Sequence, residues 1–154
     1  MVTEADRAVV EEQLGRMPQG AFEVVARDAD GRPRVIENAP LLDDGTPMPT
    51  SYWLVGEHDR LVVSRLESIG GVREAERAVS AEAIADAHRR YATARDARLP
   101  QGHTGPVPSG GVGGTARGLK CLHAHYAWHL AGGDDPVGAW VAARLAEQPA
   151  GMPA

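Results

Sequence analysis

Several features common in other protein classes are scarce or missing in this sequence of 154 residues. Its single cysteine cannot form a disulfide within the chain, so we expect a protein of a reducing compartment, the cytoplasm. No charged and then apolar leader opens the sequence, and no apolar run approaches the roughly 18 residues that a membrane-spanning helix needs. We therefore expect a soluble protein with no membrane partner.

Basic residues are also few, with 16 Lys and Arg against 21 Asp and Glu and a formal net charge of -5. This balance lacks the basic footprint of nucleic-acid binders, so we expect no nucleic-acid partner, although a local group of cations can still bind a small anion. Aromatic residues make up only 5%, so the core must be built mainly from Val, Leu, Ile and Ala. A chain of this length can bury such a core without disulfides or a structural metal.

The order of the hydrophobic patterns predicts an α+β fold. Stretches rich in β-branched and aromatic residues predict three strands, at residues 21–27, 33–37 and 50–55. Because their connections are short, we expect a small antiparallel sheet of about three strands with one face covered by helices. Helical periodicity in the rest of the chain predicts four or five helices. We expect a single α+β domain over residues 1–148 and a disordered tail over residues 149–154.

Three capping signals predict where helices begin. Thr3, followed three residues later by Asp6, resembles a capping box. Ser80 can cap a second helix, so we expect a break near it in the helical stretch over residues 72–99. Asp135, directly before a proline, predicts the first turn of the last helix.

The reactive side chains are concentrated in residues 110–129, where a glycine-rich loop is followed by a helical pattern. This segment holds the only cysteine and three of the six histidines. We expect the helix to span residues 116–131 and to bury one narrow stripe, formed by Leu119, Leu122, Tyr126 and Leu130. The spacing i, i+4, i+8 then places three side chains on one flank of that stripe: Cys121, His125 and His129. His123 lies on the opposite flank.

Two ligands at i and i+4 on one helix can reach the same metal ion, and thiolate with imidazole suits zinc or another late transition metal. The helix does not supply a full tetrahedral set, so a further ligand is expected from elsewhere, with three candidates: His103, His88 and Glu67. Two alternatives remain open. One is a metal-free site with Cys121 as nucleophile and His125 as base. In the other, these residues serve only in packing.

The glycine-rich segment predicts an anion site, because glycines let several backbone N–H groups point one way and a helix N-terminus adds partial positive charge. Thr115 is expected to cap the helix or to bond a phosphate oxygen. The other expected ligand-binding residues are Gly113, Gly114, Arg117, Lys120 and Arg65. The segment lacks the ending of a P-loop and does not follow a strand as a dinucleotide-binding loop does. The alternative is a flexible connector in which Thr115 is an ordinary cap.

Motifs distributed over nearly the whole chain carry a family resemblance. They are Pro47-Met48-Pro49-Thr50, Ser64-Arg65-Leu66-Glu67, Gly111-Val112-Gly113-Gly114-Thr115, Lys120-Cys121-Leu122-His123-Ala124-His125 and Asp135-Pro136-Val137-Gly138. Together they resemble the bacterial "domain of unknown function 501" family, which is common in actinobacteria. The resemblance implies that Cys121, His123 and His125 form the family motif, which favours a cluster at the start of the helix over a stripe that includes His129. It implies no established activity. Family members are often encoded near polyphosphate-metabolism genes, which points to a phosphate-containing ligand.

These observations predict a small-molecule site at the glycine-rich loop and the Cys/His helix. The expected metal ligands are Cys121, His123, His125 and His129, and the expected catalytic residues are the first three of these. We expect zinc and a hydrolytic reaction on a small phosphorylated or otherwise anionic molecule. The alternatives are a non-catalytic binding or adaptor protein with a structural Cys/His cluster, and a metal-free enzyme with a cysteine nucleophile. No oligomeric state follows from the sequence.

Overall fold

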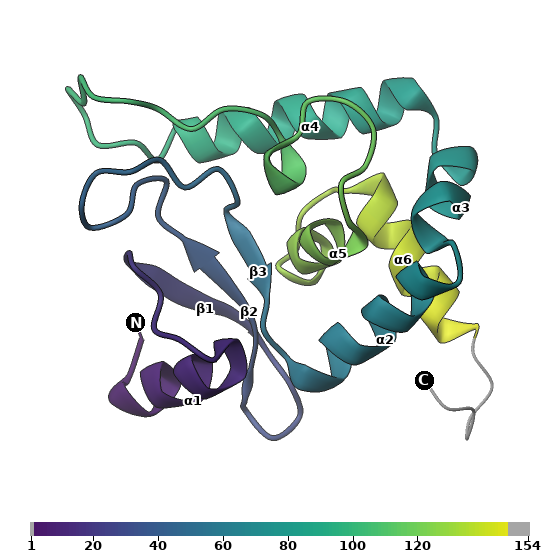
Figure 1. The fold of residues 1–154 in the computed structure, drawn as a ribbon, viewed down its shortest axis with the longest axis horizontal. Helices are drawn as coiled ribbons and strands as arrows, with labels where there is room; N and C mark the ends of the chain where they lie inside the picture. The colour runs from purple at the N-terminus through teal and green to yellow at the C-terminus, as the bar shows by residue number, and fades with distance from the viewer. Residues whose placement is uncertain (1, 148–154) are drawn as a thin grey trace.

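A computed structural model describes residues 2–147 of the chain (Figure 1). In chain order the elements are α1 (Glu4–Leu14), β1 (Phe22–Arg27), β2 (Pro33–Asn38), β3 (Tyr52–Leu54), α2 (Glu57–Ser68), α3 (Gly71–Ala78), α4 (Ala81–Asp96), the 3-10 helix η1 (Val112–Gly114), α5 (Leu122–Leu130) and α6 (Pro136–Ala146). The α+β class is therefore confirmed, with six α-helices in the described residues where four or five were expected. The expected tail over residues 149–154 lies outside them. No helix in the described part is long and apolar enough to cross a membrane.

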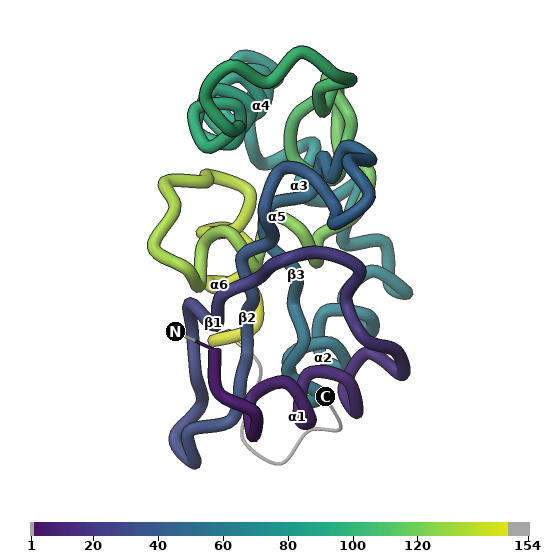
Figure 2. Tube along the Cα trace, turned by 90° about the vertical axis from the view of Figure 1, so that its left-hand side faces the viewer, coloured from purple at the N-terminus to yellow at the C-terminus, as the bar shows by residue number. Residues whose placement is uncertain are grey.

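The sheet is antiparallel, with β2 between β1 and β3. Val35 and Ile36 are neighbours in β2 and therefore point to opposite faces of the sheet. Both are fully buried, so both faces are covered. Ile36 packs with Phe22 and with Val10 of α1 in one cluster, whereas Val35 packs with Leu54 and the helices of the main core in another. Helices thus cover both faces, where the sequence predicted one covered face. Figure 2 shows α1 at one end of the molecule and α4 at the other.

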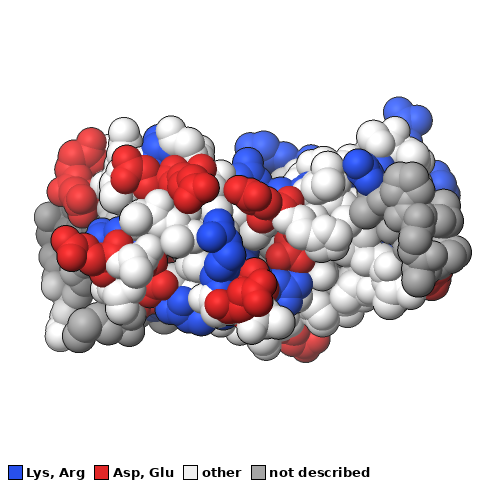
Figure 3. All heavy atoms as spheres, turned by 90° about the horizontal axis from the view of Figure 1, so that it is seen from below, with Lys and Arg blue, Asp and Glu red and all other residues white. Residues whose placement is uncertain are grey.

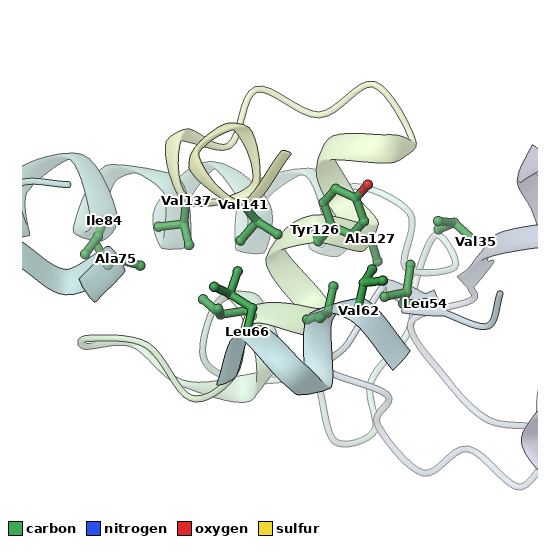
Figure 4. Close-up of a cluster of buried hydrophobic side chains, with 12 residues drawn as sticks. Val35, Leu54, Val62, Leu66, Ala75, Ile84, Tyr126, Ala127, Val137 and Val141 are labelled. Carbon is green, nitrogen blue, oxygen red and sulfur yellow. The ribbon is translucent and has the colours of Figure 1, made fainter. Parts of the chain in front are cut away.

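Helix α5 lies at the centre of the molecule and packs against β3, α2 and α6 (Figure 1). Figure 4 shows its side chains meeting residues from β2, β3 and the helices α2, α3, α4 and α6 in the main core. Of the predicted core stripe, Leu122 and Tyr126 are buried and Leu119 and Leu130 pack at the edge of the same cluster. The burial is not confined to a narrow stripe, because four more residues of α5 are buried: Ala124, His125, Ala127 and Trp128. The side chains at the first turn of α5 are therefore positioned by packing against several other elements of the fold.

The three predicted caps are present. Thr3 and Asp6 exchange both bonds of a capping box, at 3.0 and 3.2 Å. The Oγ of Ser80 accepts the N–H of Ala83 at 3.1 Å, so the predicted break separates α3 from α4. The carboxylate of Asp135 accepts a backbone N–H in the first turn of α6. Each of these signals depends on residues close in sequence, which is why the pattern alone located it.

Helix α5 begins six residues later than expected, at Leu122 instead of residue 116. Gly118 has a φ of 58°, in the left-handed region, and this conformation is incompatible with a right-handed helix through the segment. Cys121 is extended, with φ -154° and ψ 165°, and is the N-cap residue. Thr115, Arg117 and Lys120 therefore precede the helix, and Thr115 does not cap it.

The charges on the face seen from below in Figure 3 are of both signs. Acidic and basic side chains are interspersed there, and this view contains no broad basic surface. Several charged side chains of the protein form ion pairs, including Arg27 with Asp6 at 2.9 Å and Arg34 with Asp59 at 2.8 Å. The ion pairs connect α1 and α2 to the strands.

Candidate functional site

Three potential metal ligands meet where α2 packs on the start of α5. The Sγ of Cys121, a ring nitrogen of His123 and a carboxylate oxygen of Glu67 all lie within 4.8 Å of one another. Glu67 belongs to the last turn of α2, whereas Cys121 and His123 belong to the N-terminal end of α5. Within the described residues, these are the three side chains of this kind (His, Cys, Asp or Glu) whose ligand atoms lie close enough together to share one metal ion.

Side chains of α2 hold His123 at both of its ring nitrogens. Oε2 of Glu67 accepts the N–H of Leu122 at 2.7 Å and lies 3.3 Å from Nδ1 of His123. The Oγ of Ser64, one turn earlier on α2, lies 3.2 Å from Nε2 of His123. Glu67 therefore supplies the cap that Cys121 does not, and its negative charge is favourable at the N-terminus of a helix. The imidazole has a defined orientation before any ligand binds.

Cys121 and His123 shift each other's pKa in opposite directions. Burial by itself raises the pKa of the Cys121 thiol, but the hydrogen bond with His123 and the nearby N–H of Ala124 outweigh burial, and the pKa falls below its ordinary value of 9.0. The same hydrogen bond with Cys121 raises the pKa of His123 against the effect of burial, and the charge of Glu67 adds to the increase. The surroundings thus favour a thiolate, which is the form that attacks electrophiles and binds metals.

A cavity of about 290 Å³ lies directly beside Cys121 and His123. We call it the Cys121 cavity. In the described part of the chain its charged lining consists of Arg60 and Lys120, without an aspartate or glutamate. Glu67 is not part of its wall, so this carboxylate lies behind the two residues that face the cavity. The volume is at the lower end of the range of small-molecule sites.

Buried polar side chains of α4 hold the two segments that supply different parts of the cavity lining. Nη1 of Arg95, whose side chain is 1% exposed, donates to the carbonyls of Pro49 and Gly110 at 3.0 Å each. The hydroxyl of Tyr91 accepts the N–H groups of Ser51 and Tyr52. One segment leads into β3 and the other is the glycine-rich segment, so α4 fixes the distance between them.

His88, one of the candidate metal ligands, instead anchors the glycine-rich segment. Its Nδ1 accepts the N–H of Val112 at 3.0 Å, so Nε2 carries the proton and donates to the carbonyl of Gly118 at 2.8 Å. A Cβ on Gly111 would lie 2.5 Å from Cβ of His88, which explains why a glycine occupies this position. His103, another candidate, hydrogen-bonds through Nε2 to a carbonyl of its own loop, that of Pro106.

His125 and His129 are not part of the cluster around Cys121. His125 is 1% exposed, and its Nδ1 lies 2.6 Å from Oδ2 of Asp135, which is fully buried. The Nε2 of His125 is also buried and has no hydrogen-bond partner among residues 2–147. His129 stacks on the ring of Tyr126. The expected i, i+4, i+8 set therefore does not converge, because Cys121 precedes the helix that carries the two histidines.

The structure brings only some of the predicted anion-binding residues to the Cys121 cavity. Gly113 and Lys120 line it, whereas Gly114, Arg65 and Thr115 do not. The hydroxyl of Thr115 donates to the carbonyl of Arg117 at 3.0 Å. The side of the segment that carries Arg117 lines a separate cavity between α3 and α4.

Residues 24–143 match the sequence profile of a family described as "Protein of unknown function (DUF501)". The matched range contains Glu67, Cys121 and His123 as well as both cations of the Cys121 cavity. The match confirms the resemblance seen in the sequence motifs. No curated protein and no solved structure matches the chain.

Proposed function

We propose, for a chain that belongs to the DUF501 family of proteins of unknown function, that Glu67, Cys121 and His123 bind a transition-metal ion, zinc in the first place. The bound metal would act hydrolytically on a small anionic molecule in the Cys121 cavity. The observation that carries this proposal is the convergence of three donor atoms, two of them from residues that line a cavity whose charged lining within the described residues is cationic.

The donor set suits zinc in chemistry and in spacing. Thiolate, imidazole and carboxylate are its usual ligands, at about 2.0–2.3 Å from the ion, so two ligand atoms of a tetrahedral site lie about 3.3–3.8 Å apart. The three donors here are within 4.8 Å of one another, so side-chain movements of about 1 Å would close them on an ion. The lowered pKa of Cys121 also favours the thiolate that zinc requires.

Three protein ligands leave one tetrahedral position for water or substrate, which is typical of catalytic zinc and not of structural zinc. Because Cys121 and His123 line the cavity, that position would face it. Zinc would lower the pKa of a bound water to about 7 and so supply hydroxide near neutral pH. Arg60 and Lys120 would attract the anionic group of the substrate.

Elemental analysis of untagged protein after reconstitution with zinc tests the metal site. We expect about one zinc per chain in the wild type, loss of zinc in Cys121→Ser and Glu67→Gln, and retention in His129→Asn. The last variant is the control because it alters a histidine of the same helix outside the cluster. Zinc retained by all variants, or by none including the wild type, would contradict the proposal. X-ray absorption then counts the ligands: four protein ligands would indicate a structural site.

A second candidate is metal-free nucleophilic catalysis by Cys121. It is favoured by the closeness of the Cys121 Sγ to a ring nitrogen of His123, within 4.8 Å, and by the position of both residues on the cavity wall. His123, oriented by Glu67, would be the acid and base, in place of the His125 expected from sequence. This candidate predicts rapid alkylation of Cys121 at the same rate with and without a chelator. Slow alkylation of the native, metal-free protein would exclude it.

A further inference from the structure

The lining of the Cys121 cavity has a cationic part and an apolar part. The cations are Lys120, directly before the metal-ligand candidates, and Arg60 of α2. The apolar part comes from Leu14 at the end of α1 and from Trp53 and Leu54 of β3. Residues distant in sequence thus form one small cavity with two chemically different surfaces.

Both cations are available to a ligand. Neither Arg60 nor Lys120 forms an ion pair within residues 2–147. One nitrogen of Arg60 donates to the carbonyl of Gln13 at 2.6 Å, which positions the guanidinium and leaves its other N–H groups for a second acceptor. Two cations without an ion pair that line the same cavity match a dianion better than a monoanion.

The apolar surface selects the rest of the ligand. A polar or charged group against Leu14, Leu54 and the indole of Trp53 would lose its hydrogen bonds to water without replacing them. An aromatic ring or an alkyl chain would instead gain the free energy of burying apolar area. Inorganic phosphate alone would leave this part of the cavity unused.

We propose that the Cys121 cavity binds a phosphate monoester of an aromatic or apolar alcohol. The phosphate, with a charge near -2 at neutral pH, lies between Lys120 and Arg60, and the organic group lies against Trp53 and the two leucines. As a substrate assignment this inference rests on the proposed hydrolytic function, whereas the binding itself requires no metal. Hydrolysis would join a water oxygen to phosphorus, break the ester P–O bond and transfer a proton to the departing alcohol.

Titration calorimetry with phenyl phosphate, inorganic phosphate and phenol tests the assignment on the full chain. We expect phenyl phosphate to bind at least tenfold more tightly than either of the other two probes, since each of them lacks one half of the ligand. Lys120→Gln should weaken phenyl phosphate binding about tenfold, because it removes one charge-assisted hydrogen bond. Arg117→Gln, which alters a cation of the same segment outside the cavity, should change it less than twofold.

Equal binding of phenyl phosphate and inorganic phosphate would overturn the inference, and so would equal effects of Lys120→Gln and Arg117→Gln. Cys121→Ser separates this inference from the proposed function. If the wild type binds no zinc and phenyl phosphate still binds both proteins, the binding assignment stands and the metal proposal fails. If zinc binds and phenyl phosphate does not, the metal proposal stands and the phosphate-monoester assignment fails.

Discussion

The buried pair of Asp135 and His125 allows a quantitative stability prediction. Asp135 accepts from His125 at 2.6 Å with one oxygen and from the N–H of Val137 at 2.9 Å with the other. Removing one member of a buried pair costs about 3–5 kcal/mol, and losing an N-cap side chain costs about 1 kcal/mol. The Nε2 of His125 already lacks a partner, so the stranded imidazole has no alternative bond. Asp135→Ala should therefore lower the free energy of unfolding by about 4 kcal/mol or more.

Urea unfolding followed by tryptophan fluorescence measures this loss. With a slope of about 2 kcal/mol per molar urea, the midpoint should fall by about 2 M. Asp135→Asn separates the two contributions, because asparagine caps a helix as well as aspartate does but carries no charge. We expect Asp135→Asn to be more stable than Asp135→Ala by about 1 kcal/mol.

Asp134→Ala is the matched control. Asp134 is the adjacent aspartate, it is exposed, and only its backbone carbonyl is used, by Arg90. Its replacement should change the stability by less than about 0.5 kcal/mol. A loss below about 1 kcal/mol in Asp135→Ala, or an equal loss in both variants, would refute the reasoning that the buried pair joins α5 to α6.

Three further changes test the site. Ser64→Ala should weaken zinc binding about 10–100-fold in a chelator competition assay, because groups behind a ligating histidine orient it. In zinc-free protein, His123→Ala should move the pH midpoint of Cys121 alkylation upward: His123 stabilises the thiolate and holds the pKa of Cys121 below 9.0, so at pH 7 the variant should react more slowly than the wild type. Arg95→Lys should lower the stability by about 2 kcal/mol in urea unfolding and weaken phenyl phosphate binding, because the shorter lysine cannot reach both carbonyls and also bond to Asp96 as the guanidinium does.

Each of these changes has its own control. Ser68 is a second serine of α2 that bonds only to its own helix backbone, so Ser68→Ala should leave zinc affinity unchanged. A wild-type alkylation midpoint at or above 9.0 would contradict the stabilised thiolate. Arg89 is an exposed arginine of α4, and the role of Arg95 is refuted if Arg89→Lys weakens phosphate binding equally.

The fold was largely predictable because its signals are local. Ser80 and Asp135 cap helices through atoms two or three residues away, and the strands follow from short runs of β-branched and aromatic residues. The covering of both sheet faces was not predictable, because it depends on where α1 packs. Val35 and Ile36 are adjacent apolar residues, as in strands buried on both faces, but a single such pair is too short a pattern to predict that burial.

The site was predicted in location but not in composition. A helix that began at residue 116 would place Cys121 beside His125. The left-handed conformation of Gly118 instead delays the start of the helix to Leu122, so that Cys121 lies beside His123. Glu67 was one of three candidates for a further ligand, since nothing in a single sequence shows which distant carboxylate packs on the start of α5. Arg60 carried no signal, because its place in the cavity arises only from tertiary packing.

His123 and His125 are two residues apart on α5 and consequently point to nearly opposite sides of the helix. His123 faces α2 and the cavity, whereas His125 faces the buried carboxylate that caps α6. One short motif thus presents a donor atom and also fixes the helix that carries it. Two measurements distinguish these roles. His123→Ala should abolish zinc binding with little change in the free energy of unfolding, whereas His125→Ala should mainly lower the free energy of unfolding. Equal losses of both properties in the two variants would mean that metal binding and helix packing are one cooperative unit.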